Sequence, residues 1–216
     1  MKNVFIINHP VISHNLVTIR DKQYDCESFR TAMRRVSYAL FLEATRFLPT
    51  KQIEIETPLC KTMHDDIDPD IEIILAPILR AGVAFCDVAQ EILPTAKVQH
   101  LGMYRDEETL QPVWYYNKTF RIGEDPTKTH VLVLDPMLAT GNSAYNAIKC
   151  YIDKGVPLEN IVFVCLLAAP EGVKLLQDNF GDIKIITTHV DSHLNEKGYI
   201  VPGLGDAGDK IFNTRY

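Results

Sequence analysis

The segment Val131–Ser143, VLVLDPMLATGNS, constrains the fold of this chain more than any other stretch. Its first four residues are apolar and β-branched at alternate positions, which is typical of a parallel strand covered on both faces. Pro136 cannot continue a central strand, and a small-residue loop then leads into a helix expected over residues 144–153. The order strand, acid, loop, helix indicates an α/β sheet with Asp135 at the carboxyl end of a strand.

The loop that follows this strand is suited to a phosphate group. A helix N-terminus leaves backbone N–H groups unpaired and carries partial positive charge. Thr140 and Ser143 add hydroxyl donors, and Gly141 allows close approach of the backbone to a ligand. Asp135 is placed to hold sugar hydroxyls or a magnesium ion. Many such turns bind nothing, so the residue types alone leave a purely structural turn open.

Composition limits the classes of protein to which this chain can belong. The 216 residues are 46% hydrophobic and 23% charged, as in an ordinary soluble globular protein. No linker divides them, which predicts a single domain over residues 1–216. The net charge of −6 argues against a nucleic-acid partner. No signal peptide or membrane span is expected, and five widely spaced cysteines fit reduced thiols. The sequence therefore predicts a cytoplasmic protein without a membrane partner.

Strand and helix patterns alternate along the chain, which argues for a parallel sheet wrapped by helices. Residues 1–24 are expected to form an irregular arm, and residues 62–69 an acidic surface turn. An amphipathic helix is expected over residues 26–48. A second helix is expected over residues 83–93, and another follows Gly172 and ends at about residue 179. Strands are expected over residues 53–57, 71–78, 98–103, 113–117, 161–167 and 183–187.

Three other features carry possible chemistry. Arg80, beside two small residues at the end of a strand, suits an anion because guanidinium can donate two parallel hydrogen bonds to phosphate; an exposed turn arginine is the alternative. His189 and His193 could share a helical face, but no third His or Cys ligand is near, so a metal site there is a weak prediction. Gly203-x-Gly205-x-x-Gly208 fits a dinucleotide fingerprint by letter, yet only eight residues follow it.

Four segments, in order, resemble the uracil phosphoribosyltransferases, a branch of the type I phosphoribosyltransferase family. They are ILRAG (78–82), YRDEET (104–109), DPMLATG (135–141) and GYIVPGLGDAG (198–208). The resemblance implies an α/β fold whose central, mostly parallel sheet is flanked by helices. It adds a β-hairpin lid over about residues 104–130 and a small C-terminal hood over about residues 188–216. The implied reaction converts uracil and phosphoribosyl pyrophosphate (PRPP) to uridine monophosphate (UMP) and pyrophosphate, in pyrimidine salvage.

The resemblance also assigns roles to residues of this chain. Arg80, Arg105 and Asp206 are the expected catalytic residues, and Mg²⁺ is the expected cofactor, held mainly through PRPP with Asp206 as a candidate contact. Related enzymes often have a non-proline cis peptide in the loop that carries Arg80. A GTP effector and a homodimer or homotetramer are further expectations. The expected uracil-binding residues are Ile200, Gly205, Asp206 and Ala207. The expected PRPP-binding residues are Arg80, Arg105, Asp135, Pro136, Met137, Leu138, Ala139, Thr140, Gly141, Asn142, Ser143 and Asp206.

Three departures from the family pattern leave alternatives open. Asn142 stands where the family has a second glycine, and asparagine adopts left-handed backbone angles less freely than glycine. Asn213 also replaces a usual glycine, and Ser192-His193 replace an acid and an arginine. The chain could use another base, or it could be a nucleotide-sensing or catalytically weakened paralogue on the same fold.

Overall fold

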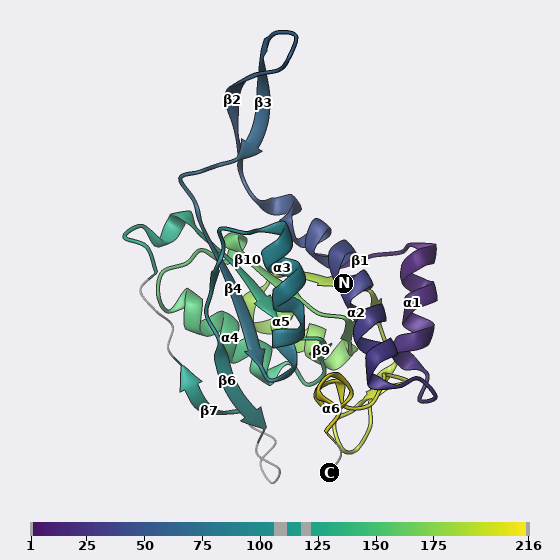
Figure 1. The fold of residues 1–216 in the computed structure, drawn as a ribbon. Helices are drawn as coiled ribbons and strands as arrows, with labels where there is room; N and C mark the ends of the chain where they lie inside the picture. The colour runs from purple at the N-terminus through teal and green to yellow at the C-terminus, as the bar shows by residue number, and fades with distance from the viewer. Residues whose placement is uncertain (1, 106–111, 118–121, 215–216) are drawn as a thin grey trace.

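The computed structural model of the chain describes residues 2–105, 112–117 and 122–214 (Figure 1). Within them the main sheet has the strand order β1-β12-β10-β8-β4-β6-β7, and β5 pairs with β4. Neighbouring strands are parallel except for the pair β6–β7. The expected mostly parallel α/β sheet is confirmed. Its strands are β1 (Val4–Ile6), β4 (Glu72–Leu79), β5 (Lys97–Val98), β6 (Leu101–Arg105), β7 (Pro112–Asn117), β8 (Thr129–Leu134), β10 (Ile161–Val164) and β12 (Lys184–Thr187).

Helices cover both faces of this sheet (Figure 1). In β8, Leu132 and Leu134 pack into the core beneath α1, α2 and α3, while Val131 and Val133 pack into the core beneath α4 and α5. Burial on both faces explains why the strand is a continuous apolar run. No helix in the described part of the chain is long and apolar enough to span a membrane. The helices are α1 (Pro10–Arg20), α2 (Cys26–Ala44), α3 (Cys86–Ile92), α4 (Asn142–Ile152) and α5 (Pro170–Phe180), with 3₁₀ turns at Thr45–Phe47, Ala81–Phe85, Pro126–Lys128 and Leu158–Asn160.

Short strands extend the architecture beyond the carboxyl ends of the main strands. A parallel three-stranded sheet has the order β13-β11-β9, and β14 pairs with β15 in antiparallel fashion. The helix α6 (Ala207–Phe212) follows, and β13, β14, β15 and α6 lie in the segment after residue 188 that is called the hood below. The strands are β9 (Met137–Leu138), β11 (Leu167–Ala168), β13 (His189–Val190), β14 (His193–Leu194) and β15 (Ile200–Val201).

A hairpin of β2 (Thr50–Glu56) and β3 (Lys61–Ile67) projects away from the body of the protein (Figure 1). The expected strand near residues 53–57 is confirmed, but the surface turn expected over residues 62–69 is wrong. Each β3 residue pairs with one in β2, from Thr50 opposite Ile67 to Glu56 opposite Lys61. The segment KTMHDDI is polar and has two aspartates, which are rare in strands, so its sequence gave little sign of this pairing.

The irregular arm expected over residues 1–24 is also wrong. The strand β1 pairs with β12 at the sheet edge. The helix α1 begins where the His9 ring accepts a hydrogen bond from the Val11 N–H (3.1 Å), and Pro10 occupies a first-turn position that tolerates proline. Ile12 and Ile19 of α1 are buried. The buried isoleucines show that this segment forms an amphipathic helix and not an irregular arm.

Candidate active site

Three of the four sequence motifs meet beyond the carboxyl ends of β4 and β8. They line one cavity of 270 Å³ between the sheet and the hood. Open α/β sheets bind ligands in this position. The loop after β4 contributes Ala81, the 135–143 loop contributes Asp135, Met137 and Ala139, and the hood contributes Gly198, Tyr199, Ile200, Gly205, Asp206, Ala207 and Gly208.

The 135–143 loop ends in a tight turn that starts α4. Gly141 has a φ of +86°, and its carbonyl accepts the first helical hydrogen bond, from the Tyr145 N–H at 2.8 Å. Asn142 is the first residue of α4 and is not among the described non-glycine residues with positive φ. The left-handed backbone conformation of this loop therefore belongs to Gly141, which the chain shares with the family, and not to Asn142. The asparagine therefore meets no left-handed strain in this loop.

We expect Asn142→Gly to leave the KM for PRPP within about twofold, because no backbone strain is relieved. The change should lower the free energy of unfolding by up to about 1 kcal/mol, the usual cost of glycine in a helix. Steady-state kinetics and urea unfolding measure the two effects. The control is Gly141→Ala, which keeps φ at +86° and brings a Cβ to 3.0 Å from the Gly172 carbonyl oxygen, so it should impair PRPP use. A large gain in PRPP affinity for Asn142→Gly would contradict this account.

Asp135 lies half-buried at the cavity wall, and its Oδ1 accepts a hydrogen bond from the Met137 N–H at 3.2 Å. Burial raises the pKa of this carboxyl to about 7, against the lowering effect of that hydrogen bond, and the negative charge of Asp206 adds to the rise. The two carboxyl groups therefore interact across the cavity. A cation or hydrogen-bond donors from a ligand would favour the charged form of Asp135.

Arg80 follows β4, and its guanidinium faces the hood. Its Nη2 lies 3.7 Å from Oδ1 of Asp209, and half of its side chain is exposed. The peptide bond between Leu79 and Arg80 is cis, as expected for this loop. Partial exposure leaves the guanidinium accessible to an anion.

The hood brings Asp206 to the cavity at the start of α6. Its Oδ1 accepts a hydrogen bond from the Asp209 N–H at 3.0 Å and thereby caps the helix. Ile200 and Ala207 also line the cavity and are each at most 5% exposed, so their side chains belong mainly to the core. Between them, Gly205 and Asp206 are exposed and line the cavity, so the backbone there is open to a ligand.

The expected lid cannot be followed through the structure. β6 ends at Arg105, and residues 106–111, which hold most of the YRDEET motif, lie outside the described residues, as does the side chain of Arg105. The returning strand, expected over 113–117, is confirmed as β7. Thr129 is buried within β8, so the sheet resumes before the boundary expected for the lid at residue 130.

The remaining residues expected to bind PRPP lie beside the cavity wall. Leu138 is 1% exposed and packs beneath α4 and α5, so only its backbone is available to a ligand. Pro136 is buried as well. Thr140, Asn142 and Ser143 are partly exposed where α4 begins. These positions match a loop that binds phosphate mainly through backbone groups and hydroxyls.

The two histidines singled out in the sequence do not share a helical face. His189 belongs to β13 and His193 to β14. Among the described residues there is no group of three or more His, Cys, Asp or Glu side chains arranged to hold a metal ion.

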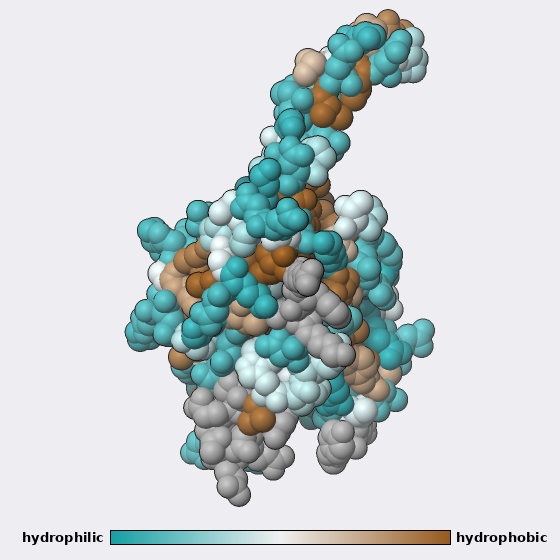
Figure 2. All heavy atoms as spheres, turned by 90° about the vertical axis from the view of Figure 1, so that its left-hand side faces the viewer, coloured by the Kyte–Doolittle hydropathy of each residue, from teal (hydrophilic) through white to brown (hydrophobic). Residues whose placement is uncertain are grey.

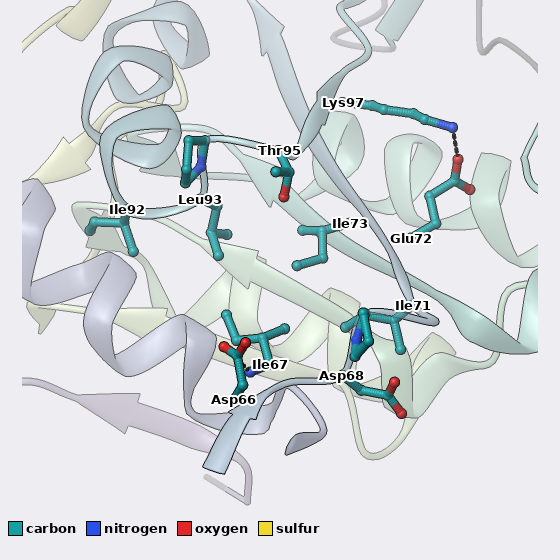
Figure 3. A pocket seen from close by; sticks show the side chains of 12 residues that line it. Asp66, Ile67, Asp68, Ile71, Glu72, Ile73, Ile92, Leu93, Thr95 and Lys97 are labelled. Carbon is teal, nitrogen blue, oxygen red and sulfur yellow. Dashed lines mark hydrogen bonds and ion pairs between the residues drawn. The ribbon is translucent and has the colours of Figure 1, made fainter. Parts of the chain in front are cut away.

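A larger cavity, of 580 Å³, lies at the opposite end of β4, beside the base of the β2–β3 hairpin (Figure 3). Its walls combine apolar side chains such as Ile73 and Leu93 with Asp66, Asp68 and the ion pair between Lys97 and Glu72. It contains none of the residues expected to bind substrate. Size alone therefore does not identify the active site in this fold.

Comparison with known proteins decides the family. The family model described as uracil phosphoribosyltransferase matches residues 6–214. The chain belongs to the uracil phosphoribosyltransferase family. Curated family members include the uracil phosphoribosyltransferase of Dictyoglomus thermophilum, 45% identical over 98% of this chain and 100% of that protein. The corresponding protein of Streptococcus suis is 48% identical over 97% of this chain and 98% of its own length.

Solved structures share the fold of this chain. The AQ2163 protein of Aquifex aeolicus superposes with a TM-score of 0.86 at 35% identity, covering 97% of each chain. An adenine phosphoribosyltransferase of Trypanosoma brucei shares only the fold, with a TM-score of 0.57 at 12% identity over 95% of this chain and 89% of its own. The expectations of the family, the type I phosphoribosyltransferase fold and a pentosyl-transferring enzyme are confirmed.

Several residues of this candidate site were not predicted from the sequence. Tyr199 and Gly198 line the cavity, and Asp209 faces Arg80. All three lie in or next to the GYIVPGLGDAG motif, which was the signal available to find them. The pairing of Arg20 with Asp191 follows only from the fold, because 171 residues separate them.

Proposed function

We propose that this chain forms UMP and pyrophosphate from uracil and PRPP, as a step of cytoplasmic pyrimidine salvage. One observation carries the proposal. A single cavity is lined by the loop after β4, the 135–143 loop and the hood. These are the segments expected to hold pyrophosphate, ribose phosphate and base, respectively.

The protein positions both substrates by distinct groups. The start of α4, with Thr140 and Ser143, holds the 5′-phosphate of PRPP, and Asp135 accepts hydrogen bonds from the ribose hydroxyls. The backbone at Ile200 and Gly205–Ala207 matches the alternating donors and acceptors along the edge of uracil. Fixing the two reactants side by side removes much of the entropic barrier to their reaction.

The reaction replaces the bond from ribose C1′ to pyrophosphate with a bond to uracil N1. Positive charge develops on the ribose and negative charge on the departing pyrophosphate. Arg80 and Arg105 stabilise the leaving group as its charge grows. The N1 proton passes to Asp206, which lies at the base side of the cavity. A lid over residues 104–130 keeps water from the activated ribose.

The donor set of the cavity fits a magnesium ion. Asp135 and Asp206 present oxygen ligands, and the negative charge of Asp206 raises the pKa of Asp135. A divalent cation would relieve this repulsion. Among the described residues that line the cavity these are the two carboxylates, so PRPP oxygens and water would complete the shell of a bound ion, which would supply neutralisation of the pyrophosphate charge.

The direct test measures UMP formation from labelled uracil and PRPP with magnesium. Cytosine and hypoxanthine serve as parallel substrates, and a second series adds GTP to test its proposed role as an effector. Uracil-specific turnover supports the proposal. Turnover with another base overturns the base assignment. Binding of PRPP or UMP without any turnover means a nucleotide-sensing or weakened paralogue instead.

The proposal includes a homo-oligomer, a homodimer or a homotetramer, in which a second copy covers the β2–β3 hairpin. The hairpin strands pair only with each other among the described residues. Leu59 at its tip is 94% exposed and Met63 is 55% exposed, and Figure 2 shows apolar side chains along the projecting arm. An isolated two-stranded hairpin is marginally stable in water. Cover from a partner would therefore stabilise it.

We expect the double substitution Leu59→Asp and Met63→Asp to shift the protein toward monomers in sedimentation velocity. The control is Leu42→Asp, which changes an exposed leucine of α2 on the body and should leave the assembly intact. A double variant that sediments like the unmodified protein would remove the hairpin from the interface.

A further inference from the structure

A largely buried ion pair holds the loop on the base side of the cavity. Arg20, the last residue of α1, donates from Nη2 to Oδ1 of Asp191 at 2.7 Å and from Nη1 to Oδ2 at 2.8 Å. The Asp191 side chain is 1% exposed and the Arg20 side chain 23%. Two parallel charge-assisted hydrogen bonds fix both side chains in a single geometry.

The same pair binds both backbone groups of Gly203. Nη1 of Arg20 donates to the Gly203 carbonyl at 2.9 Å, and the Gly203 N–H donates to Oδ2 of Asp191 at 2.9 Å. Gly203 has a φ of +57°, and a Cβ there would lie 2.1 Å from the carbonyl oxygen of Ile200. The pair therefore clamps a sharp turn that folds directly against a residue of the cavity wall.

The Arg20–Asp191 ion pair and its two hydrogen bonds to Gly203, called the clamp below, connect this turn to β11 and α1. The Asp191 N–H donates to the Ala168 carbonyl of β11 at 2.8 Å, and Arg20 belongs to α1, which packs on α2. Gly205 and Asp206 follow Gly203 by two and three residues and line the cavity. The position of the base-side backbone is thus set by a helix and a strand remote in sequence.

We infer that Arg20, acting through Asp191 and Gly203, is a positioning residue for recognition of the base. The inference rests on the proposed function, because it takes the hood to be the uracil side of the cavity. Loss of the clamp frees the turn at Gly203 but leaves the 135–143 loop and Arg80 in place. Base binding therefore weakens more than PRPP binding, because that loop and Arg80 supply most of the expected PRPP contacts.

The test compares Arg20→Lys and Arg20→Met in the full-length protein. Lysine keeps the charge, but its compact ammonium lacks the planar fork that spans both Asp191 oxygens and the Gly203 carbonyl. We expect Arg20→Met to raise the KM for uracil about 10- to 100-fold, the scale of a small misplacement of a binding group. Arg20→Lys should give a smaller rise of the same kind, and in both variants the KM for PRPP should rise clearly less than the KM for uracil.

The matched control is Arg30→Met. Arg30 also reaches the hood, where its Nη1 donates to the Ile211 carbonyl at 3.1 Å, but it does not contact Gly203. This variant should leave the KM for uracil nearly unchanged. Circular dichroism and thermal unfolding establish that each variant is folded, and Arg20→Lys carries the comparison if Arg20→Met does not fold.

The outcomes separate the inference from the proposed function. An unchanged KM for uracil in a folded Arg20 variant, or equal rises in both KM values, would overturn the inference while the activity itself stands. Absence of UMP formation by the unmodified protein counts against the proposed function. Isothermal titration calorimetry with UMP then compares the two variants without turnover. If the clamp positions the base, UMP binds more weakly to Arg20→Met than to Arg30→Met.

Discussion

Asp206→Asn is expected to lower kcat about 10²- to 10⁴-fold, the usual contribution of a positioned proton acceptor. Stability should change little. The Asp206 carboxylate caps α6 by accepting the Asp209 N–H at 3.0 Å, and an asparagine oxygen can accept the same hydrogen bond. The substitution therefore removes the charge and the basicity at the cavity while it keeps the helix cap.

Steady-state kinetics with uracil, thermal unfolding and equilibrium binding of PRPP check this expectation together. The control is Asp209→Asn, which alters an acid of the same helix that faces Arg80 at 3.7 Å but does not line the cavity. Its effect on kcat should be much smaller. Near-normal turnover of Asp206→Asn would remove this residue from the chemistry, and a large loss of stability would mean that its role is mainly structural.

The layered part of the fold could be predicted because its signals are local. β8 and β10 are continuous apolar runs, as expected for strands with helices on both faces, and α2 shows its buried stripe at helical spacing. The expected ends of these elements differ from the observed ones by only a few residues. Each of these patterns can be recognised without knowing which other segment it packs against.

The segments that were missed depend on distant partners. β3 is entirely exposed and mostly polar, so only its pairing with β2 makes it a strand. β1 is three residues long and exists because β12 offers it a sheet edge. α1 did carry a local signal, a proline at the first turn and buried isoleucines seven residues apart.

In the candidate site too, single residues could be predicted from local sequence, whereas the contacts between them could not. Asp135 and Asp206 were found because each lies in a motif at the start of a helix, where the local sequence fixes the backbone. The effect of Asp206 on the pKa of Asp135 follows only from the fold, which brings residues 71 positions apart to one cavity. The contact of Arg80 with Asp209 likewise joins separate motifs. Sequence patterns thus identified the groups, and the tertiary structure determined how they interact.

Asp135→Asn is expected to stabilise the unliganded protein while it lowers kcat/KM for PRPP about 100-fold, the value of one or two charge-assisted hydrogen bonds. Burial raises the pKa of Asp135 from 3.8 to about 7. Between these pH values the folded state binds a proton that the unfolded state has released. The free energy of unfolding therefore falls as pH rises from about 4 to 7, and the penalty persists above pH 7.

Asparagine avoids this penalty because it is neutral at every pH and can still accept the Met137 N–H. The gain in stability over the unmodified protein should be near zero at pH 4, grow up to pH 7 and then level off. A pKa displaced this far corresponds to at most about 4 kcal/mol, and partial exposure of the carboxyl reduces it. Thermal unfolding from pH 4 to pH 8 measures the difference. Asp178→Asn, which changes a carboxylate 58% exposed on α5, is the control and should show no such rise. A gain in stability that does not vary with pH would mean that Asp135 is not desolvated. A gain that grows with pH, together with a low kcat/KM for PRPP, would show that the Asp135 carboxylate serves substrate binding at a cost in stability.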